Sequence, residues 1–276
     1  NTYMYVNDQY VFVTGNVELN ATDSNVYLRN NSQLLQGTAA VGGANTGLGA
    51  LSVYQEGTVN NYQYNYWCSP VGGSLATVGN SPFGITQLGI PSTNLDTTSF
   101  TPAGILPIGN YNGVSGNGTL SIAPYWIWTF RSSTTYAQWF QIAAASTLAA
   151  GEGFTMKGTS GSDTFTPFTG SGANNPGSKQ RYDFRGKPND GTINIPVDNL
   201  KFTLVGNPYP SAIDLNMVLG KDAPGPDTIW GTADDIGTIN NPAINGTAYF
   251  WEQVVLNTHL IAGYQGGYGK YTPAGG

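Results

Sequence analysis

Four aspartates gather in the stretch DAPGPDTIWGTADDIGT, which runs from residue 222 to residue 238. They are four of the sixteen acidic residues of the chain: Asp222, Asp227, Asp234 and Asp235. Calcium takes about six to eight oxygen ligands, from carboxylates, backbone carbonyls and water, and glycines let a loop bend toward the ion. The stretch therefore predicts a structural calcium site. A solvated loop without an ion is the alternative, because the spacing is not that of an EF-hand.

Residues for enzymatic chemistry are few. His259 is the only histidine and Cys68 the only cysteine, so the sequence has too few nitrogen and sulfur ligands for a zinc site. Neither a P-loop nor a nucleophile-elbow motif occurs. A pair of carboxylates, Glu152 and Glu252, leaves glycosidase chemistry as a third hypothesis. We expect no enzyme, with His259 as a packed or surface imidazole and Cys68 as a buried small apolar side chain.

Aromatic residues suggest a second kind of site. The segment PYWIWTF, residues 124–130, reads as a strand that carries Trp126, Trp128 and Phe130 on one face. Such a stripe is either the inner face of a sandwich or a platform on which sugar rings stack. Together with Trp251 of the segment GTAYFWEQVV, Trp126 and Trp128 are the candidate glycan-binding residues.

Basic residues alternate with aromatic ones in KQRYDFRGK, residues 179–187. In a strand, one face carries the charged side chains and the other carries Tyr182 and Phe184. The charged set is Lys179, Arg181, Asp183, Arg185 and Lys187. Two interpretations are open for it: a solvated outer face, or a basic stripe for an acidic polysaccharide or a neighbouring acidic subunit.

Composition limits what these residues can belong to. Only 9% of the residues are charged and the net charge is −6, which argues against nucleic acid as a partner. No apolar run approaches the roughly 20 residues of a membrane span. Short runs of Val, Ile and aromatic residues between Gly, Pro and Asn turns are typical of strands joined by tight turns.

The predicted fold is all-β. A small β-rich region over residues 1–60, read as a solenoid or a meander of hairpins, precedes a sandwich or jelly-roll-like domain over residues 61–276. A short helix near 211–219 has Ser211 as its expected N-cap and Gly220 as its stop. Tyr3, Tyr5, Tyr10 and Phe12 mark an N-terminal strand that is open to pairing with another chain.

Several segments in this order resemble large surface proteins of Bacteroidota, especially flavobacteria, that are exported by the type IX secretion system. They are NVYLRNNSQLLQG, LSVYQEGTVNNYQYNYWCSPVG, AGEGFTMKG, RYDFRGKPNDGTI, FTLVGNPYPSAIDLN and YQGGYGKYTPAGG. The resemblance implies an extracellular or outer cell-surface location, a β-rich fold and no known enzyme activity. It also implies O-glycosylation at Thr97 and Thr228, which follow aspartates in a short motif of the flavobacterial relatives.

These observations favour a non-enzymatic surface protein for structure or adhesion, which associates with itself or with other surface proteins into a filament or a surface layer. The alternative is a monomeric glycan-binding module of a larger secreted protein, with a polysaccharide as its partner.

Overall fold

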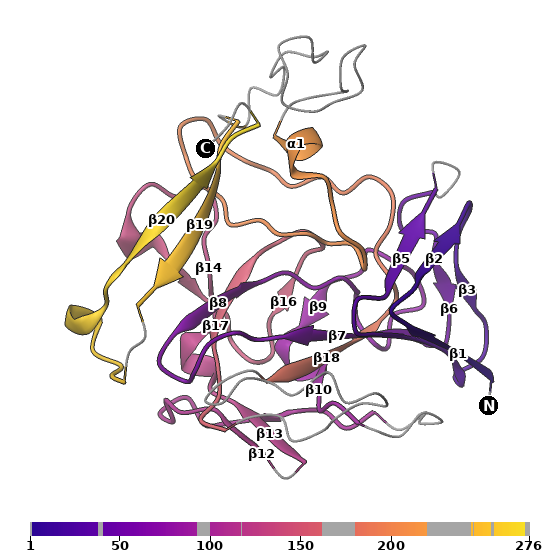
Figure 1. Cartoon of the computed structure of the whole chain (residues 1–276), viewed down its shortest axis with the longest axis horizontal. Helices are drawn as coiled ribbons and strands as arrows, with labels where there is room; N and C mark the ends of the chain where they lie inside the picture. The colour runs from indigo at the N-terminus through magenta and orange to yellow at the C-terminus, as the bar shows by residue number, and fades with distance from the viewer. Residues whose placement is uncertain are drawn as a thin grey trace.

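The computed structural model describes residues 2–37, 41–92, 100–116, 118–161, 180–219, 244, 246–254 and 257–273. Within these residues the chain forms twenty β-strands, one single-turn α-helix and four 3-10 turns (Figure 1). The predicted all-β class is therefore confirmed. No described helix combines the length and the apolar composition that crossing a membrane would need.

The N-terminal strands stack as coils of a parallel β-solenoid. Strands of successive coils pair in parallel in three stacks. The stacks are β1 (Thr2–Asn7), β4 (Ser24–Arg29) and β7 (Ala50–Glu56); β2 (Tyr10–Val13) and β5 (Gln33–Gln36); and β3 (Glu18–Leu19) and β6 (Thr46–Gly47). Of the two arrangements left open for this region, the solenoid is the one observed.

Successive side chains along each solenoid strand point alternately into the solenoid and away from it. Met4 lies in register with Val26 and Val26 with Leu51, while Val11 lies in register with Leu34. These ladders line the interior of the solenoid, because stacking places like side chains of successive coils against one another.

One strand from late in the chain joins the solenoid to the rest of the molecule. β18 (Arg181–Gly186) pairs antiparallel with β7, and β10 (Leu88–Gly89) pairs with β18. The resulting sheet has the strand order β1-β4-β7-β18-β10. Residues 1–60 and the remainder of the described chain therefore share one sheet and one hydrophobic core.

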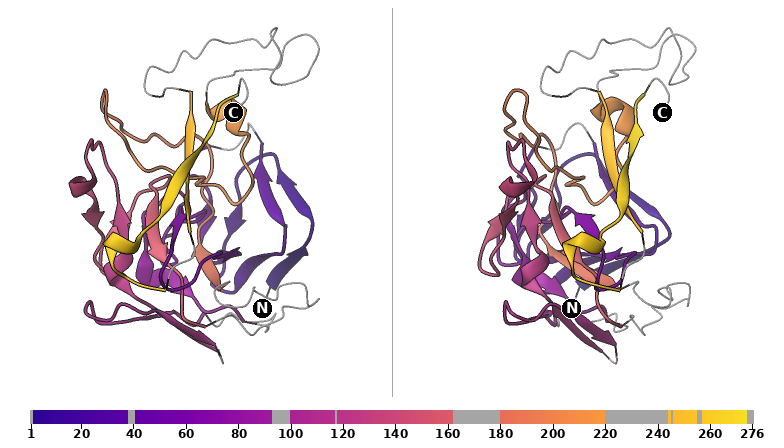
Figure 2. Two further views of the ribbon diagram at one scale, coloured as in Figure 1. Left: turned by 60° about the vertical axis from the view of Figure 1, so that its left-hand side comes forward. Right: turned by 90° about the vertical axis from the view of Figure 1, so that its left-hand side faces the viewer.

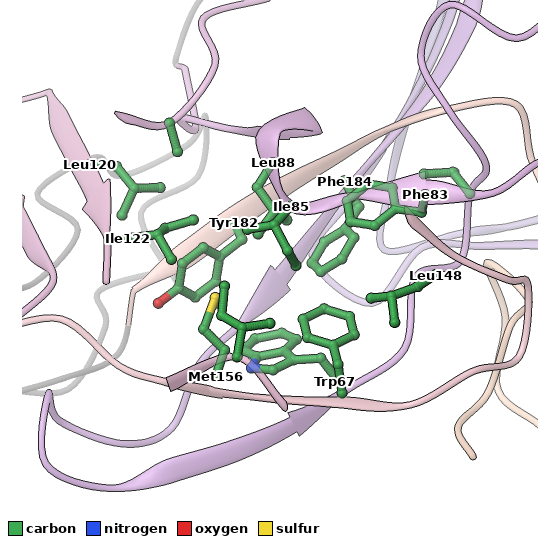
Figure 3. Packing of buried hydrophobic residues seen from close by; sticks show 14 of the residues in the cluster. Trp67, Phe83, Ile85, Leu88, Leu120, Ile122, Leu148, Met156, Tyr182 and Phe184 are labelled. Atoms are coloured by element: carbon green, nitrogen blue, oxygen red, sulfur yellow. The ribbon is translucent and has the colours of Figure 1, made fainter. Parts of the chain in front are cut away.

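A four-stranded sheet packs against this first sheet. Its order is β15 (Phe140–Gln141), β14 (Trp128–Thr129), β17 (Phe154–Lys157) and β8 (Tyr64–Trp67). Trp67 of this sheet meets Tyr182 and Phe184 of β18 at ring-centroid distances of 5.2 and 5.9 Å, and these rings form the centre of the core (Figure 3). Two sheets thus face each other across aromatic side chains, as in sandwich packing.

Small sheets complete the fold. One pairs β9 (Phe83–Gly84) with β16 (Thr147–Leu148), and another has the order β11 (Gly104–Ile105), β13 (Thr119–Ile122), β12 (Val114–Gly116). The C-terminal hairpin of β19 (Ala248–Gln253) and β20 (Gly266–Tyr271) is drawn in yellow in Figure 1. It and the indigo N-terminal coils lie on opposite sides in that view, and Figure 2 gives two further views.

Two local expectations were wrong. Residues 124–130 are not one strand: Pro124–Trp126 is a 3-10 turn and only Trp128–Thr129 is a strand, because Pro124 lacks a donor and suits the first position of a turn. The short helix expected near 211–219 is present as the single turn α1 (Leu215–Val218), but its predicted start was wrong. Its N-cap is Asp214, whose side chain accepts a hydrogen bond from the Asn216 backbone, and not Ser211.

The charged face of β18 is also not solvated. Arg181, Asp183, Arg185 and Lys187 are all buried, and Tyr182 and Phe184 occupy the opposite face as the alternation predicts. Lys179 lies outside the described residues. Ser92 and Phe100 lie over this face, since the Tyr54 hydroxyl donates to the Ser92 carbonyl at 2.8 Å and Arg185 lies over the Phe100 ring.

Candidate functional site

Several predicted sites cannot be placed. The acidic loop with Asp222, Asp227, Asp234 and Asp235 lies outside the described residues, as do the glycosylation candidates Thr97 and Thr228. Among the residues that the structure does describe, no group of three or more His, Cys, Asp or Glu side chains is arranged to hold a metal ion.

The first coil of the solenoid has an open end. β1 and β2 are the outermost strands of their sheets. The predicted edge residues Tyr3, Tyr10 and Phe12 are exposed, Tyr10 by 69% and Phe12 by 66%, and Tyr5 is half-buried. An apolar cavity of about 160 Å³ lies inside the solenoid, between first-coil residues that include Met4 and Val11 and the later-coil residues Val26, Leu34 and Leu51.

A buried lysine lies on the outer face of the four-stranded sheet. Lys157 ends β17, opposite Tyr64 of β8, and only 4% of its surface is exposed. Segments near the C-terminal hairpin cover it. Its Nζ lies 3.1 Å from His259 Nδ1, donates to the Tyr264 hydroxyl, and sits 3.6 Å from the centroid of the Trp126 ring. We call Lys157, His259, Tyr264, Tyr64 and Trp126 the lysine cluster.

The charge state of the lysine cluster follows from this geometry. Burial lowers the pKa of Lys157 to about 7. Burial and, secondarily, the charge of Lys157 lower the pKa of His259. His259 Nε2 lies 2.8 Å from the Asn112 side-chain oxygen, so the neutral imidazole carries its proton on Nε2 and accepts at Nδ1 from Lys157.

Among the described residues, no carboxylate contacts Lys157. Its amine lies over the rings of Tyr64, Trp126 and Tyr264, so cation–π interactions take the place of an ion pair. Burial also raises the pKa of Tyr264 to about 12, so this hydroxyl stays neutral. An amine with a lowered pKa is a nucleophile in some enzymes. Here the amine is enclosed by Trp126, Tyr64 and Tyr264, and its described contacts fasten the C-terminal segment onto the sheet.

Sequence reasoning missed this cluster. The sequence predicts a packed or surface imidazole at His259, and Lys157 stands out only as part of the segment AGEGFTMKG that carries the resemblance. The lone histidine was the one available signal, and nothing near it in the sequence indicates a lysine about a hundred positions earlier.

A second buried group of cations lies on the outer face of the five-stranded sheet. Arg185 Nη2 forms an ion pair with Asp183 Oδ2 at 2.9 Å. Ser52 Oγ donates to Asp183 Oδ1 at 2.6 Å and accepts from Arg29 Nη2 at 3.0 Å. Arg29 also lies 3.5 Å from the centroid of the Tyr54 ring. We call Arg29, Ser52, Tyr54, Asp183 and Arg185 the arginine cluster.

Aromatic rings form a partly exposed band between the hairpin and the four-stranded sheet. Tyr268 of β20 lies 5.0 Å from Trp251 and 6.5 Å from Tyr249, both of β19. The hydroxyl groups of Tyr268 and of Tyr66 of β8 lie close enough to interact, and Tyr66 lies 6.5 Å from Trp139. We call Tyr66, Trp139, Tyr249, Trp251 and Tyr268 the aromatic strip.

A surface hollow of about 450 Å³ adjoins this strip at Tyr66. Gln55, Glu56 and Asn207 supply polar side chains to its lining, and Trp67 and Cys68 lie at its buried side. Cys68 is buried as expected, and burial raises the pKa of its thiol to about 12. A hollow with amides, a carboxylate and aromatic rings suits a ligand with hydroxyl groups and apolar faces.

The candidate glycan-binding tryptophans are separated by the fold. Trp126 is 6% exposed, and its ring is covered by Lys157 and by His259, which stacks on it at 5.0 Å. It is therefore not available to a ligand. Trp128 is half-buried in β14, and Trp251 is half-buried in the hairpin.

The carboxylates considered for glycosidase chemistry have other surroundings. Glu152 forms an ion pair with Arg131 and accepts from the Ala149 backbone N–H at 3.2 Å. Glu252 is exposed in β19, opposite Gly267. No described contact joins the two.

The fold and these surfaces define an all-β protein in which a short parallel solenoid continues into packed sheets. The chain belongs to the family described as "Domain of unknown function (DUF8693)", whose model matches residues 107–274. The match includes both strands of the C-terminal hairpin and Lys157, while the solenoid coils precede it. No curated protein and no solved structure matches the chain.

Proposed function

We propose that this is a non-enzymatic extracellular or cell-surface protein for structure or adhesion, which associates with a second copy through the first coil of its solenoid. The observation that carries the proposal is the open coil end. There, strands β1 and β2 are outermost in their sheets.

A strand at a sheet edge presents backbone donors and acceptors that another strand can pair with. The exposed rings of Tyr10 and Phe12 and the half-exposed Met4 supply apolar area beside that edge. Pairing there would bury this area, which favours association because apolar surface leaves water. Repeated association of this kind builds a filament or a surface layer.

Calcium at the acidic loop belongs to the same proposal. Asp222, Asp227, Asp234 and Asp235 would hold the ion through carboxylate oxygens, and the ion would fix a loop on the exterior. Removal of calcium with EGTA is expected to lower the thermal unfolding midpoint, and an unchanged midpoint would remove the ion from the proposal.

Electron microscopy and light scattering of the full chain test the association. The double variant Tyr10→Asp, Phe12→Asp places charges on the exposed face of β2 without altering the core, and it is expected to abolish the assemblies of the unaltered protein. Leu75→Asp is the matched control, because Leu75 is almost fully exposed elsewhere. Monomers of the unaltered protein at all concentrations, or assemblies that survive the double variant, would overturn the proposal.

A further inference from the structure

The aromatic strip stands apart from the proposed association surface. Its residues come from three parts of the chain. Tyr66 lies on β8, and Tyr249, Trp251 and Tyr268 lie on the hairpin. Trp139 directly follows the 3-10 turn Tyr136–Gln138. The hairpin and the solenoid coils are on opposite sides of the molecule (Figure 1). An inference drawn from the strip is therefore independent of the proposed association.

The rings of the strip combine exposure with fixed orientation. Tyr268 is 56% exposed, Tyr249 45% and Tyr66 38%. Ring contacts hold the aromatic side chains in place: Tyr268 lies 5.0 Å from Trp251 and 6.5 Å from Tyr249, and Tyr66 lies 6.5 Å from Trp139. Burial, followed by the interaction with Tyr268, raises the pKa of Tyr66. Aromatic side chains that are held this way bind ligands with little further loss of conformational freedom.

Polar groups lie at one end of the strip. Tyr66 belongs both to the strip and to the lining of the hollow, where Gln55 and Glu56 offer an amide and a carboxylate group. The Asn207 amide also lines the hollow, but it is hydrogen-bonded to the backbone of Tyr209 and Ser211. The hollow of about 450 Å³ falls within the size of small-molecule sites. A ligand that extends from the aromatic strip into the hollow would contact aromatic rings at one end and hydrogen-bonding groups at the other.

The negative charge of the protein limits which kinds of ligand could bind at this surface. Glu56 lines the hollow, and the chain carries a net charge of −6. Nucleic acids and polyanionic glycans are disfavoured, because their binding depends on lysine and arginine contacts. A neutral polysaccharide fits the surface, since a sugar ring offers an apolar C–H face to an aromatic ring and hydroxyl groups to amides and carboxylates.

We propose that the aromatic strip and the adjoining hollow form a binding site for a neutral polysaccharide chain. Sugar rings stack on Tyr268 and Tyr66, and hydroxyl groups of the next residues hydrogen-bond to Gln55 and Glu56 in the hollow.

Affinity electrophoresis of the full chain in gels with barley β-glucan, glucomannan or xylan tests the site, with isothermal titration of matching oligosaccharides to measure affinity. At least one of these neutral glycans is expected to retard the protein. Alginate, a polyanion, is expected not to. Retardation by alginate alone, tight binding of a proline-rich peptide in place of glycans, or no retardation by any neutral glycan would overturn the proposal.

Variants locate the site. Tyr268→Ala is expected to weaken binding at least tenfold, and Gln55→Ala about threefold. Tyr249→Ser is a second strip variant, in case Tyr268→Ala loosens the hairpin. Leu75→Ala removes an exposed apolar side chain that belongs neither to the strip nor to the proposed association surface, and it serves as the control, with no expected effect. Equal losses in Leu75→Ala and the strip variants, at unchanged unfolding midpoints, would show that the binding lies elsewhere.

Discussion

The two buried cationic clusters neutralise charge in different ways. In the arginine cluster, Arg185 is paired with the carboxylate of Asp183, and Ser52 bridges Asp183 to Arg29. In the lysine cluster, no described carboxylate contacts Lys157, and its amine faces aromatic rings and a neutral imidazole.

The chemistry of the two side chains accounts for the difference. A guanidinium keeps its proton in every folded protein, so a buried arginine needs an opposite charge or a full set of acceptors. An ammonium can lose its proton, so burial alone lowers the pKa of Lys157. One cluster is therefore expected to depend on an ion pair, and the other on pH.

The largest effect is expected at the ion pair. Asp183→Asn keeps the shape of the side chain but removes the one carboxylate that pairs with the buried Arg185 among the described residues, which should cost about 3–5 kcal/mol in the free energy of unfolding. Urea denaturation measures this value. Asp198→Asn, which removes an exposed ion pair with Lys201, should have no measurable effect. Equal changes in the free energy of unfolding for the two variants would contradict the view that the buried ion pair stabilises the protein more than the exposed one.

The pH dependence of stability sharpens the comparison. Lys157 binds a proton more weakly in the folded than in the unfolded chain, so unfolding takes up a proton above pH 7 and stability rises with pH from about 7 toward 10.5. Between pH 7 and 9 we expect a gain on the order of 2 kcal/mol relative to Lys157→Met, which cannot titrate. Parallel pH profiles for the two proteins would contradict a lowered pKa at Lys157. The comparison with the variant removes the contributions of Cys68 and the tyrosines, which both proteins share.

The smallest effect is expected at the bridging hydroxyl. Ser52→Ala removes the hydrogen bonds to Asp183 and Arg29 while leaving the ion pair of Asp183 with Arg185, so the free energy of unfolding should fall by about 1–2 kcal/mol. Thr134→Ala, which removes an exposed hydrogen bond to Gln138, is the control. A loss at Ser52 as large as that of Asp183→Asn would mean that the hydroxyl, and not the carboxylate, holds the cluster together.

Local sequence patterns predicted which face of a strand each side chain occupies better than they predicted what packs against that face. The alternation in RYDFRG correctly placed Tyr182 and Phe184 on one face of β18 and the charges on the other. It could not show that Ser92 and Phe100 would lie over the charged face. Whether a strand face is wet depends on contacts distant in sequence, which periodicity does not encode.

The lysine cluster and the aromatic strip could not be predicted from the sequence either, because both bring together residues that are distant in the chain. Trp126 was assigned to a strand with Trp128, and the 3-10 turn that begins at Pro124 instead places it against His259. Tyr66 and Tyr268 meet only because the C-terminal hairpin folds back on β8. The individual residues were visible in the sequence, but their pairing follows from tertiary structure.

The pairing of β7 with β18 has a consequence for the rate of folding. It joins Glu56 to Arg181, so the last described coil of the solenoid gains its second neighbour only after a very long loop has closed. Closing such loops is entropically unfavourable, and chains rich in distant contacts reach the native state slowly. A polypeptide that emerges from the N-terminus onward would hold its first coils beside an unfilled edge until residue 186 arrives, and it would be most prone to aggregation in that interval.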